Sequence, residues 1–244
     1  MKHGFLDSHA HLDSPLHRLD PRVKLVVALM GIALASSETA GATAPFAGYY
    51  AIGLTLALVS RVPLRHFLSR FAVATPFILT AASLPLVAVW LEERGGLDFA
   101  LAWSASVALK AYFGILMLTL LTATSDFADL LDAMRRLHVP EIIGILATLM
   151  YRHMFTLADE WARMSQARDC RSAGKLTQGR VGIYGKQLGQ AFVRSWERSD
   201  RVYAAMALRG FTGALPARER TAFGPLEWTL LVLGSVAFLA LRFG

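Results

Sequence analysis

Residues 71–91 read FAVATPFILTAASLPLVAVWL, a run of 21 positions without a charged side chain. A helix of about 20 apolar residues is long enough to cross a bilayer, so this run predicts a transmembrane helix. Pro76 and Pro85 lie inside it, and membrane helices tolerate interior prolines better than soluble helices do. The composition of the whole chain agrees, because only 18% of its residues are charged, whereas a soluble domain has about 25%.

Four further apolar runs extend this pattern over most of the chain. They cover residues 25–36, 45–60, 100–124 and 226–241, and the first, being short, draws on flanking residues such as Val23. We therefore expect an all-α polytopic membrane protein with about five transmembrane helices. The run 100–124 contains one charge, Lys110, and a charge inside a membrane helix is a functional candidate by default.

The loops between these runs differ in basic residues, which sets the expected orientation in the membrane. The loop 37–44 has no Lys or Arg, and the loop after residue 91 has Arg94 among acids. Basic residues gather instead in the N-terminal segment and in the loop 61–70: Lys2, Arg18, Arg22, Lys24, Arg61, Arg65 and Arg70. We therefore expect the N terminus in the cytoplasm, and we expect no signal peptide because the first 22 residues are polar.

Residues 126–224 differ in composition from the segment before them. They hold 15 of the 25 Lys and Arg residues and 10 of the 18 acids, and the interspersed signs are unlike a disordered tail. Helical spacing predicts a short helix at 126–137, a long helix at 141–171 and, after a Gly-rich loop at 172–186, a third helix. One apolar face of the third helix is expected from Leu188, Phe192, Trp196, Tyr203 and Met206.

The expected organisation has four parts. Residues 1–22 form a cytoplasmic N-terminal segment, 23–125 a four-helix transmembrane region, 126–224 a cytoplasmic helical region and 225–244 a C-terminal transmembrane helix. The exposed arginines of 126–224 favour a docking surface for another protein, and a solvated helical face is the alternative. The single cysteine, Cys170, excludes an intrachain disulfide framework.

The stretch LDSHAHLD at residues 6–13 suggests a different function, because Asp7-x-His9-x-His11 is typical of the first strand of a metal-dependent hydrolase barrel. Such a barrel needs about 250 residues of alternating strands and helices, and a membrane helix follows here instead. Together with His3 and His17, these imidazoles and carboxylates could bind Co²⁺ or Ni²⁺. We expect a polar tail on the membrane surface and assign no metal site and no catalytic residue.

Four stretches resemble the transmembrane T component of energy-coupling factor (ECF) transporters, in its cobalt-type, CbiQ-like branch. SPLHRLDPRVKL at 14–25 resembles the N-terminal signature of that family, and MRRLHVPEIIGILATLMYRHM at 134–154 resembles the segment that leads into its first coupling helix. RSDRVYAAMALRGFTG at 198–213 resembles the second coupling motif, and QARDCRSAGK at 166–175 lies where the first is expected. The N-terminal signature includes Asp20, Arg22 and Lys24.

The two coupling motifs differ in how well they match the Ala-Arg-Gly-like triplet of the family. The second reads Leu208-Arg209-Gly210, whereas the first reads Cys170-Arg171-Ser172 and keeps only the arginine, so that Arg168 is the alternative choice. The resemblance implies that Arg171 and Arg209, each at the end of a long cytoplasmic helix, dock in grooves of two ATPase subunits. The planar guanidinium fork can grip a carboxylate or carbonyls, and Gly210 lets the helix end.

The resemblance also implies the partners. They are a pair of cytoplasmic CbiO-like ATPases, a metal-binding CbiM-like membrane subunit and a small accessory membrane subunit, assembled in the cell inner membrane as an importer for cobalt. The chain has no GxxxxGK[ST] phosphate loop, so ATP-Mg is expected on the partner ATPase, with no cofactor in this chain and no enzymatic activity of its own. No nucleic-acid partner is expected.

Several alternatives stay open from the sequence. The same coupling role could serve a nickel or vitamin importer. A secondary metal transporter would use Lys110 and the histidines, and a metal-dependent membrane hydrolase would use His9 and His11. For a scaffold without a transport pathway, Lys110 is expected to face the helix bundle or to snorkel. Asp20 is expected to cap the first helix, with Pro21 at its first position, unless the segment forms a network with the cytoplasmic helices.

Overall fold

The fold is described from a computed structural model, which describes residues 14, 16, 19–39, 43–92, 97–137, 140–171, 180–213 and 224–243. Within these residues the chain is all-helical and contains no strand. The helices in chain order are α1 (Pro21–Ser36), α2 (Pro45–Ser60), α3 (Leu64–Glu92), α4 (Leu97–Thr124), α5 (Phe127–Arg136), α6 (Glu141–Arg171), α7 (Arg180–Leu208) and α8 (Pro225–Phe243). The expected helices at 45–60 and 141–171 are confirmed at both ends.

Two of the described helices are long and apolar enough to cross a membrane by length and composition. These segments are Leu64–Val89 in α3 and Asp98–Thr124 in α4. The helices α1 and α2 have 16 residues each and α8 has 19, which is close to or below the length of about 20 residues that a bilayer requires. The number of five transmembrane helices therefore stays a prediction.

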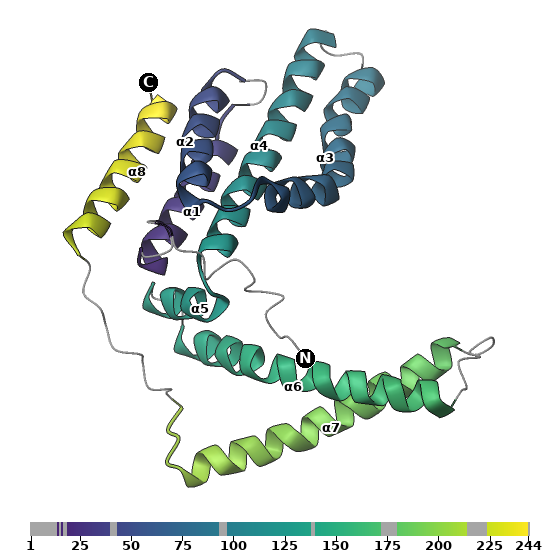
Figure 1. Cartoon of the computed structure of the whole chain (residues 1–244). Helices are drawn as coiled ribbons and strands as arrows, with labels where there is room; N and C mark the ends of the chain where they lie inside the picture. Colours follow the sequence, from purple (N-terminus) through teal and green to yellow (C-terminus); the bar gives the residue numbers. More distant parts are fainter. Residues whose placement is uncertain are drawn as a thin grey trace. The chain divides into compact units, whose positions relative to one another are not determined.

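The helix α3 begins earlier than the uncharged run at 71–91 predicts. Residues 64–70, expected as part of a basic loop, form its first turns, because apolar and basic positions alternate there with a helical period. Pro76 and Pro85 both lie inside the helix, and each removes a backbone hydrogen bond. Figure 1 shows that α3 changes direction along its length beside α4, as interior prolines allow.

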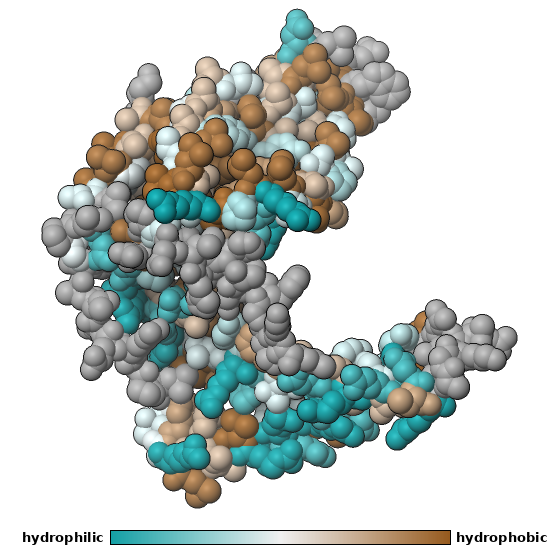
Figure 2. Space-filling model, viewed as in Figure 1, coloured by the Kyte–Doolittle hydropathy of each residue, from teal (hydrophilic) through white to brown (hydrophobic). Residues whose placement is uncertain are grey.

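The chain divides into two compact units. One unit, called here the membrane unit, contains residues 1–133 and 220–244, and the other, the coupling unit, contains residues 134–219. Hydrophobic residues dominate the visible face of α3 and α4, whereas hydrophilic residues dominate that of α6 and α7 (Figure 2). The membrane unit therefore exposes an apolar surface that a bilayer can cover.

The core of the membrane unit is an aromatic cluster among α1, α2, α4 and α8. Phe46, Tyr49, Phe113 and Phe238 are almost completely buried, and the rings of Tyr49 and Phe113 meet edge to face with centroids 5.6 Å apart. Gly31 of α1 lets the helices approach closely, because a Cβ atom there would lie 3.0 Å from the Phe238 ring. These large rings fix how the four helices pack.

The coupling unit is a helical hairpin of α6 and α7. A Gly-rich loop was predicted at 172–186, and its predicted C-terminal end is wrong, because α7 begins at Arg180 and contains Gly182 and Gly185. A glycine inside a helix costs about 1 kcal/mol relative to alanine. The contacts that Tyr184 and Gln187 make with α6 offset this cost.

Candidate coupling site

Arg171 and Arg209 lie at helix ends and are exposed. Arg171 is the last residue of α6, and Arg209 directly follows Leu208, the last residue of α7. Neither side chain has a hydrogen bond or ion pair with the part of the chain that the structure describes. In Figure 1 the free end of α7 is far from the end where α6 finishes and α7 begins, and 29 residues of helix span about 40 Å. The two arginines are therefore well separated.

The end of α7 has a defined geometry. The N–H of Phe211 donates to the carbonyl of Met206 at 3.0 Å, and the N–H of Gly210 donates to the carbonyl of Ala207 at 3.0 Å. This is the hydrogen-bond pattern of a Schellman motif. Gly210 has a φ of 78°, in the left-handed region that favours glycine. Gly210 therefore ends the helix and leaves Arg209 on its final turn.

Arg168, the alternative first-motif arginine, is held between the two helices. Its Nη1 donates to Oε1 of Gln187 at 3.0 Å, and its guanidinium lies over the Tyr184 ring, 4.6 Å from the centroid. Gln187 is buried and in turn donates to Ser165 at 2.9 Å. Arg168 thus connects α6 to α7, whereas Arg171, one turn later, is exposed.

A second brace lies further along the hairpin. The Glu160 carboxylate of α6 accepts from Arg198 at 2.9 Å and from Arg194 at 3.3 Å, both on α7. Only 12% of the Glu160 side chain is exposed, whereas the side chains of Arg194 and Arg198 are 49% and 35% exposed, so both ion pairs are partly open to water. The two braces involve residues 160–168 of α6 and 184–198 of α7, and they hold the helices together near the end that carries Arg171.

A basic groove of about 460 Å³ lies between the two helices at this end. Its lining includes the cationic or amide side chains of Arg168, Arg171, Lys186, Gln187, Gln190 and Arg194, and no described acid lines it. Positive charge concentrated in a groove attracts carboxylates from solution or from a partner protein. The surroundings of Arg171 therefore favour a negatively charged partner surface.

The α7 helix also carries an uncovered apolar stripe, formed by Leu188, Phe192, Trp196 and Tyr203. These four side chains are 63–66% exposed. Four of the five residues of the predicted apolar face are thus exposed and uncovered by α6, and the fifth, Met206, is partly buried. A contiguous exposed apolar patch marks an interaction surface.

The N-terminal signature residues lie in the membrane unit. Asp20 caps α1 as expected, because its Oδ1 accepts from the N–H of Arg22 at 2.9 Å, and Pro21 is the first helical residue. Lys24 reaches across to the end of α4, where its Nζ donates to the Thr124 carbonyl at 2.7 Å and to the Ser125 hydroxyl at 3.3 Å. The segment therefore ties the start of α1 to the end of α4.

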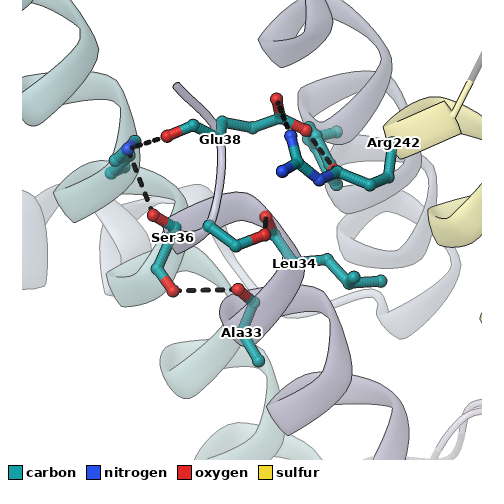
Figure 3. Close-up of polar contacts among 8 residues, drawn as sticks. Ala33, Leu34, Ser36, Glu38 and Arg242 are labelled. Atoms are coloured by element: carbon teal, nitrogen blue, oxygen red, sulfur yellow. Dashed lines mark hydrogen bonds and ion pairs between the residues drawn. The ribbon is translucent and has the colours of Figure 1, made fainter. Parts of the chain in front are cut away.

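A polar cluster at the other end of α1 was not predicted from sequence. The Glu38 carboxylate accepts from Nη1 of Arg242 at 2.9 Å and from the Tyr49 hydroxyl at 3.1 Å. Figure 3 shows the Arg242 guanidinium from α8 meeting the buried Glu38 carboxylate beyond the end of α1. Glu38 and Arg242 are 204 residues apart, and no local pattern pairs them.

Lys110 joins the same cluster. Its Nζ donates to the carbonyls of Ser36 and Glu38, at 3.1 and 2.6 Å. The lysine therefore faces the bundle, one of the two expected arrangements, and bonds to the last carbonyl of α1, that of Ser36, where a cation is favoured.

The N-terminal histidines do not contribute to the described site. His3, His9, His11 and His17 lie outside the described residues, as do Ser172 and Lys175 of the first coupling motif. Within the part of the chain that is described, no three His, Cys, Asp or Glu side chains gather where they could hold a metal ion. The described structure therefore adds no support for a hydrolase or a metal pathway.

Comparisons with known proteins point to one kind of transporter component. The sequence model of a family described as "CbiQ: Cobalt transport protein" matches residues 13–222. The chain is 27% identical to the cobalt transport protein CbiQ of Rhodobacter capsulatus, over 80% of this chain and 82% of that protein. It is also 27% identical to the energy-coupling factor transporter transmembrane protein EcfT of Listeria innocua, over 88% and 86% of the two chains.

A third relative is a longer protein. The chain is 23% identical to a putative fused cobalt transport protein CbiMQ of Methanocorpusculum labreanum, over 99% of this chain and 42% of that protein.

Proposed function

Because the chain belongs to the family of CbiQ cobalt transport proteins, we propose that it is the transmembrane coupling subunit of an ATP-driven ECF-type importer, and that the imported ion is cobalt. The observation that carries the proposal is the braced hairpin of α6 and α7 with an exposed arginine at each of two separated helix ends. Such a hairpin offers two docking sites, one for each subunit of an ATPase pair.

The ATPase pair is the first proposed partner. The guanidinium fork of Arg171 or Arg209 can hold a carboxylate or backbone carbonyls of an ATPase groove through two parallel hydrogen bonds. The Schellman motif at Gly210 supports this role for Arg209, since it fixes the backbone that presents the side chain. The basic groove beside Arg171 favours an acidic surface on the other ATPase subunit. ATP-Mg binds the ATPase subunits in this proposal.

The two braces between α6 and α7 suit the transmission of force. Glu160 with Arg194 and Arg198, and Gln187 with Arg168, connect the helices at several points. When closure of the ATPase pair displaces one arginine, the braced helices move together. The movement then reorients the metal-binding membrane subunit.

That membrane subunit is the second proposed partner. A CbiM-like protein is proposed because a relative of this chain is described as a CbiMQ fusion. The exposed stripe of Leu188, Phe192, Trp196 and Tyr203 supports an apolar docking surface for it. A small accessory membrane subunit completes the assembly, which lies in the cell inner membrane with the N terminus in the cytoplasm.

The docking proposal is tested by charge reversal at both arginines. Co-expression with the partner ATPase subunits should yield a complex, and Arg171→Glu with Arg209→Glu should abolish ATPase co-purification. The matched control is Arg163→Glu with Arg201→Glu, which makes the same charge change on exposed positions of the same helices. An intact complex in the double variant, or equal loss in the control, would contradict the assignment of Arg171 and Arg209.

The substrate is tested separately with the whole assembly. Cells that express the complete set of subunits should take up radioactive cobalt in an ATP-dependent manner. Preferential uptake of nickel or of a vitamin would keep the coupling role and replace the substrate. Uptake by this chain alone, without ATP, would instead favour a secondary transporter.

A further inference from the structure

The membrane unit contains a cavity that the coupling role does not use. Its volume is about 410 Å³, and α1, α2, α4 and α8 all contribute to its wall. Representative lining residues are Val27, Ala28, Leu56, Met117, Leu121 and Ala237. The aromatic cluster of the same unit borders it, because Phe238 and Met117 belong to both. One part of the four-helix core is thus filled by aromatic rings and the other is hollow.

The wall of this cavity is apolar, with polar groups near one end. The hydroxyl of Thr55 donates to the Ile52 carbonyl of its own helix, so it offers no free donor to a ligand. Lys24 and Thr124 also line the cavity, at the start of α1 and at the end of α4, where they bond to each other. The arrangement has the polarity of an amphiphile, with a long apolar wall and a polar border.

The cavity reaches the surface between α2 and α8. Val59 of α2 and Leu233 of α8 line it and are 46% and 70% exposed, which places its mouth at these residues. Their neighbours Leu58 and Val232 are also exposed and apolar. In a membrane protein such a surface faces lipid, so the mouth opens sideways towards the bilayer.

The contents of the cavity follow from its surroundings. Apolar cavities do not hold water, because water needs polar partners there. An empty cavity would leave its lining atoms without dispersion contacts. The apolar material that a bilayer supplies at such a mouth is the hydrocarbon chain of a lipid. We propose that one acyl chain of a bilayer phospholipid enters between α2 and α8 and occupies this cavity.

The occupant is identified by photolabelling from within the membrane. The full-length chain is reconstituted in vesicles of phosphatidylethanolamine and phosphatidylglycerol that contain phosphatidylethanolamine with a diazirine in its acyl chain. After irradiation, peptide mass spectrometry locates the labelled residues. Bilayer-facing Leu58 and Leu79 are labelled in any folded sample. Met117 and Leu121 are 1% and 6% exposed, so a label on them requires a chain inside the cavity.

Variants then test whether the label depends on the cavity volume. Ala28→Leu on α1, and independently Ala237→Leu on α8, place extra methyl groups in the cavity and should reduce the label on Met117 and Leu121 to background. Ala72→Leu makes the same change at an exposed position of α3 and should leave the label unchanged. Labelling of Leu58 reports insertion into the bilayer in every sample.

Two results would overturn the proposal. One is a wild-type chain labelled at Leu58 and Leu79 but at neither Met117 nor Leu121, which would mean that a protein segment fills the cavity or that it is closed. The other is undiminished labelling of Met117 and Leu121 in both filling variants. The wild-type measurement alone tests whether an acyl chain occupies the cavity, even if both variants fail to fold. None of these residues belongs to the ATPase docking site, so the outcome is independent of the proposed coupling role.

Discussion

In the membrane unit, Lys24, Lys110 and Arg242 have internal partners near helix ends, whereas Arg171 and Arg209 of the coupling unit have none among the described residues. Lys24 bonds to Thr124, Lys110 to the carbonyls of Ser36 and Glu38, and Arg242 to Glu38. Arg171 and Arg209 are exposed. A cation away from water needs compensation within the fold, while an arginine in water needs none and stays available to a partner. Substitutions in the membrane unit should therefore lower the stability of the chain, whereas substitutions in the coupling unit should weaken its binding to a partner.

The largest expected effect on stability comes from Glu38→Ala in the membrane unit. The change leaves Arg242 and the Tyr49 hydroxyl without their acceptor, and breaking a buried pair costs several kcal/mol. Because the Arg242 side chain is 28% exposed, we expect about 2–3 kcal/mol, seen as a lower midpoint of unfolding in detergent.

Asp98→Ala, at an exposed acid on α4, is the matched control and should leave the midpoint nearly unchanged. The folded fraction of Glu38→Ala should still bind the ATPase. Loss of ATPase binding without loss of stability in Glu38→Ala would contradict the assignment of a structural role to this cluster.

The next effect is on association rather than stability. Trp196→Ser removes a 63% exposed ring from the α7 stripe, so the free energy of unfolding should hardly change. If the stripe docks the metal-binding subunit, loss of a central aromatic residue costs about 2 kcal/mol of binding. Titration of labelled subunits in detergent measures this as an affinity about 30-fold weaker.

Val193→Ser changes a 49% exposed residue on another side of α7 and is the control. Equal losses of affinity in both variants would indicate a general effect on the helix and would contradict a specific stripe.

Gly210→Ala tests, at a single backbone position, whether the end of α7 contributes to ATPase binding. Alanine at a φ of 78° costs about 1 kcal/mol, because its Cβ is strained in the left-handed region. We expect the last turn of α7 to fray and ATPase affinity to fall about fivefold. Hydrogen exchange at the end of α7 and a binding titration measure the two effects.

Gly189→Ala is the matched control, since Gly189 lies inside α7 with open space where a Cβ would be. It should stabilise the helix slightly. A Gly210→Ala chain with unchanged hydrogen exchange would show that the Schellman motif is unnecessary.

The smallest expected effect comes from Glu160→Gln, which weakens the brace to Arg194 and Arg198. Partly exposed ion pairs contribute about 0.5 kcal/mol, and the difference from the unmodified chain should shrink at high salt. Chemical denaturation at two salt concentrations measures it. Glu197→Gln, at an exposed position of α7, is the control, and a larger loss in that variant would contradict the role of Glu160.

Helices of this chain were predictable where one local pattern determines them. The apolar run 45–60 and the segment from Glu141 to Arg171 have the expected bounds, and the cap at Asp20 follows from three adjacent residues. The errors lie where a pattern ends gradually. Glycines suggested a loop up to residue 186, yet contacts of Tyr184 and Gln187 with α6 keep that segment helical.

The candidate site was likewise predictable only where it depends on residues within one helix. The family resemblance implied that Arg171 and Arg209 lie at helix ends, and spacing arranged the apolar residues on one face of α7, because that face depends on neighbours along the same helix. Whether Arg168 or Arg171 is exposed could not be read from the chain, since they are three residues apart and differ only in which one faces α7.

Composition and periodicity act within single segments, and they were enough to predict a helical membrane protein with a basic, helical region at 126–224. The packing of the helices was needed to show that Arg168 bonds to Gln187 of α7, that Glu38 pairs with Arg242, and that a cavity remains beside the aromatic cluster. These features depend on which helix faces meet, and residues 204 positions apart carry no mutual signal in a single sequence.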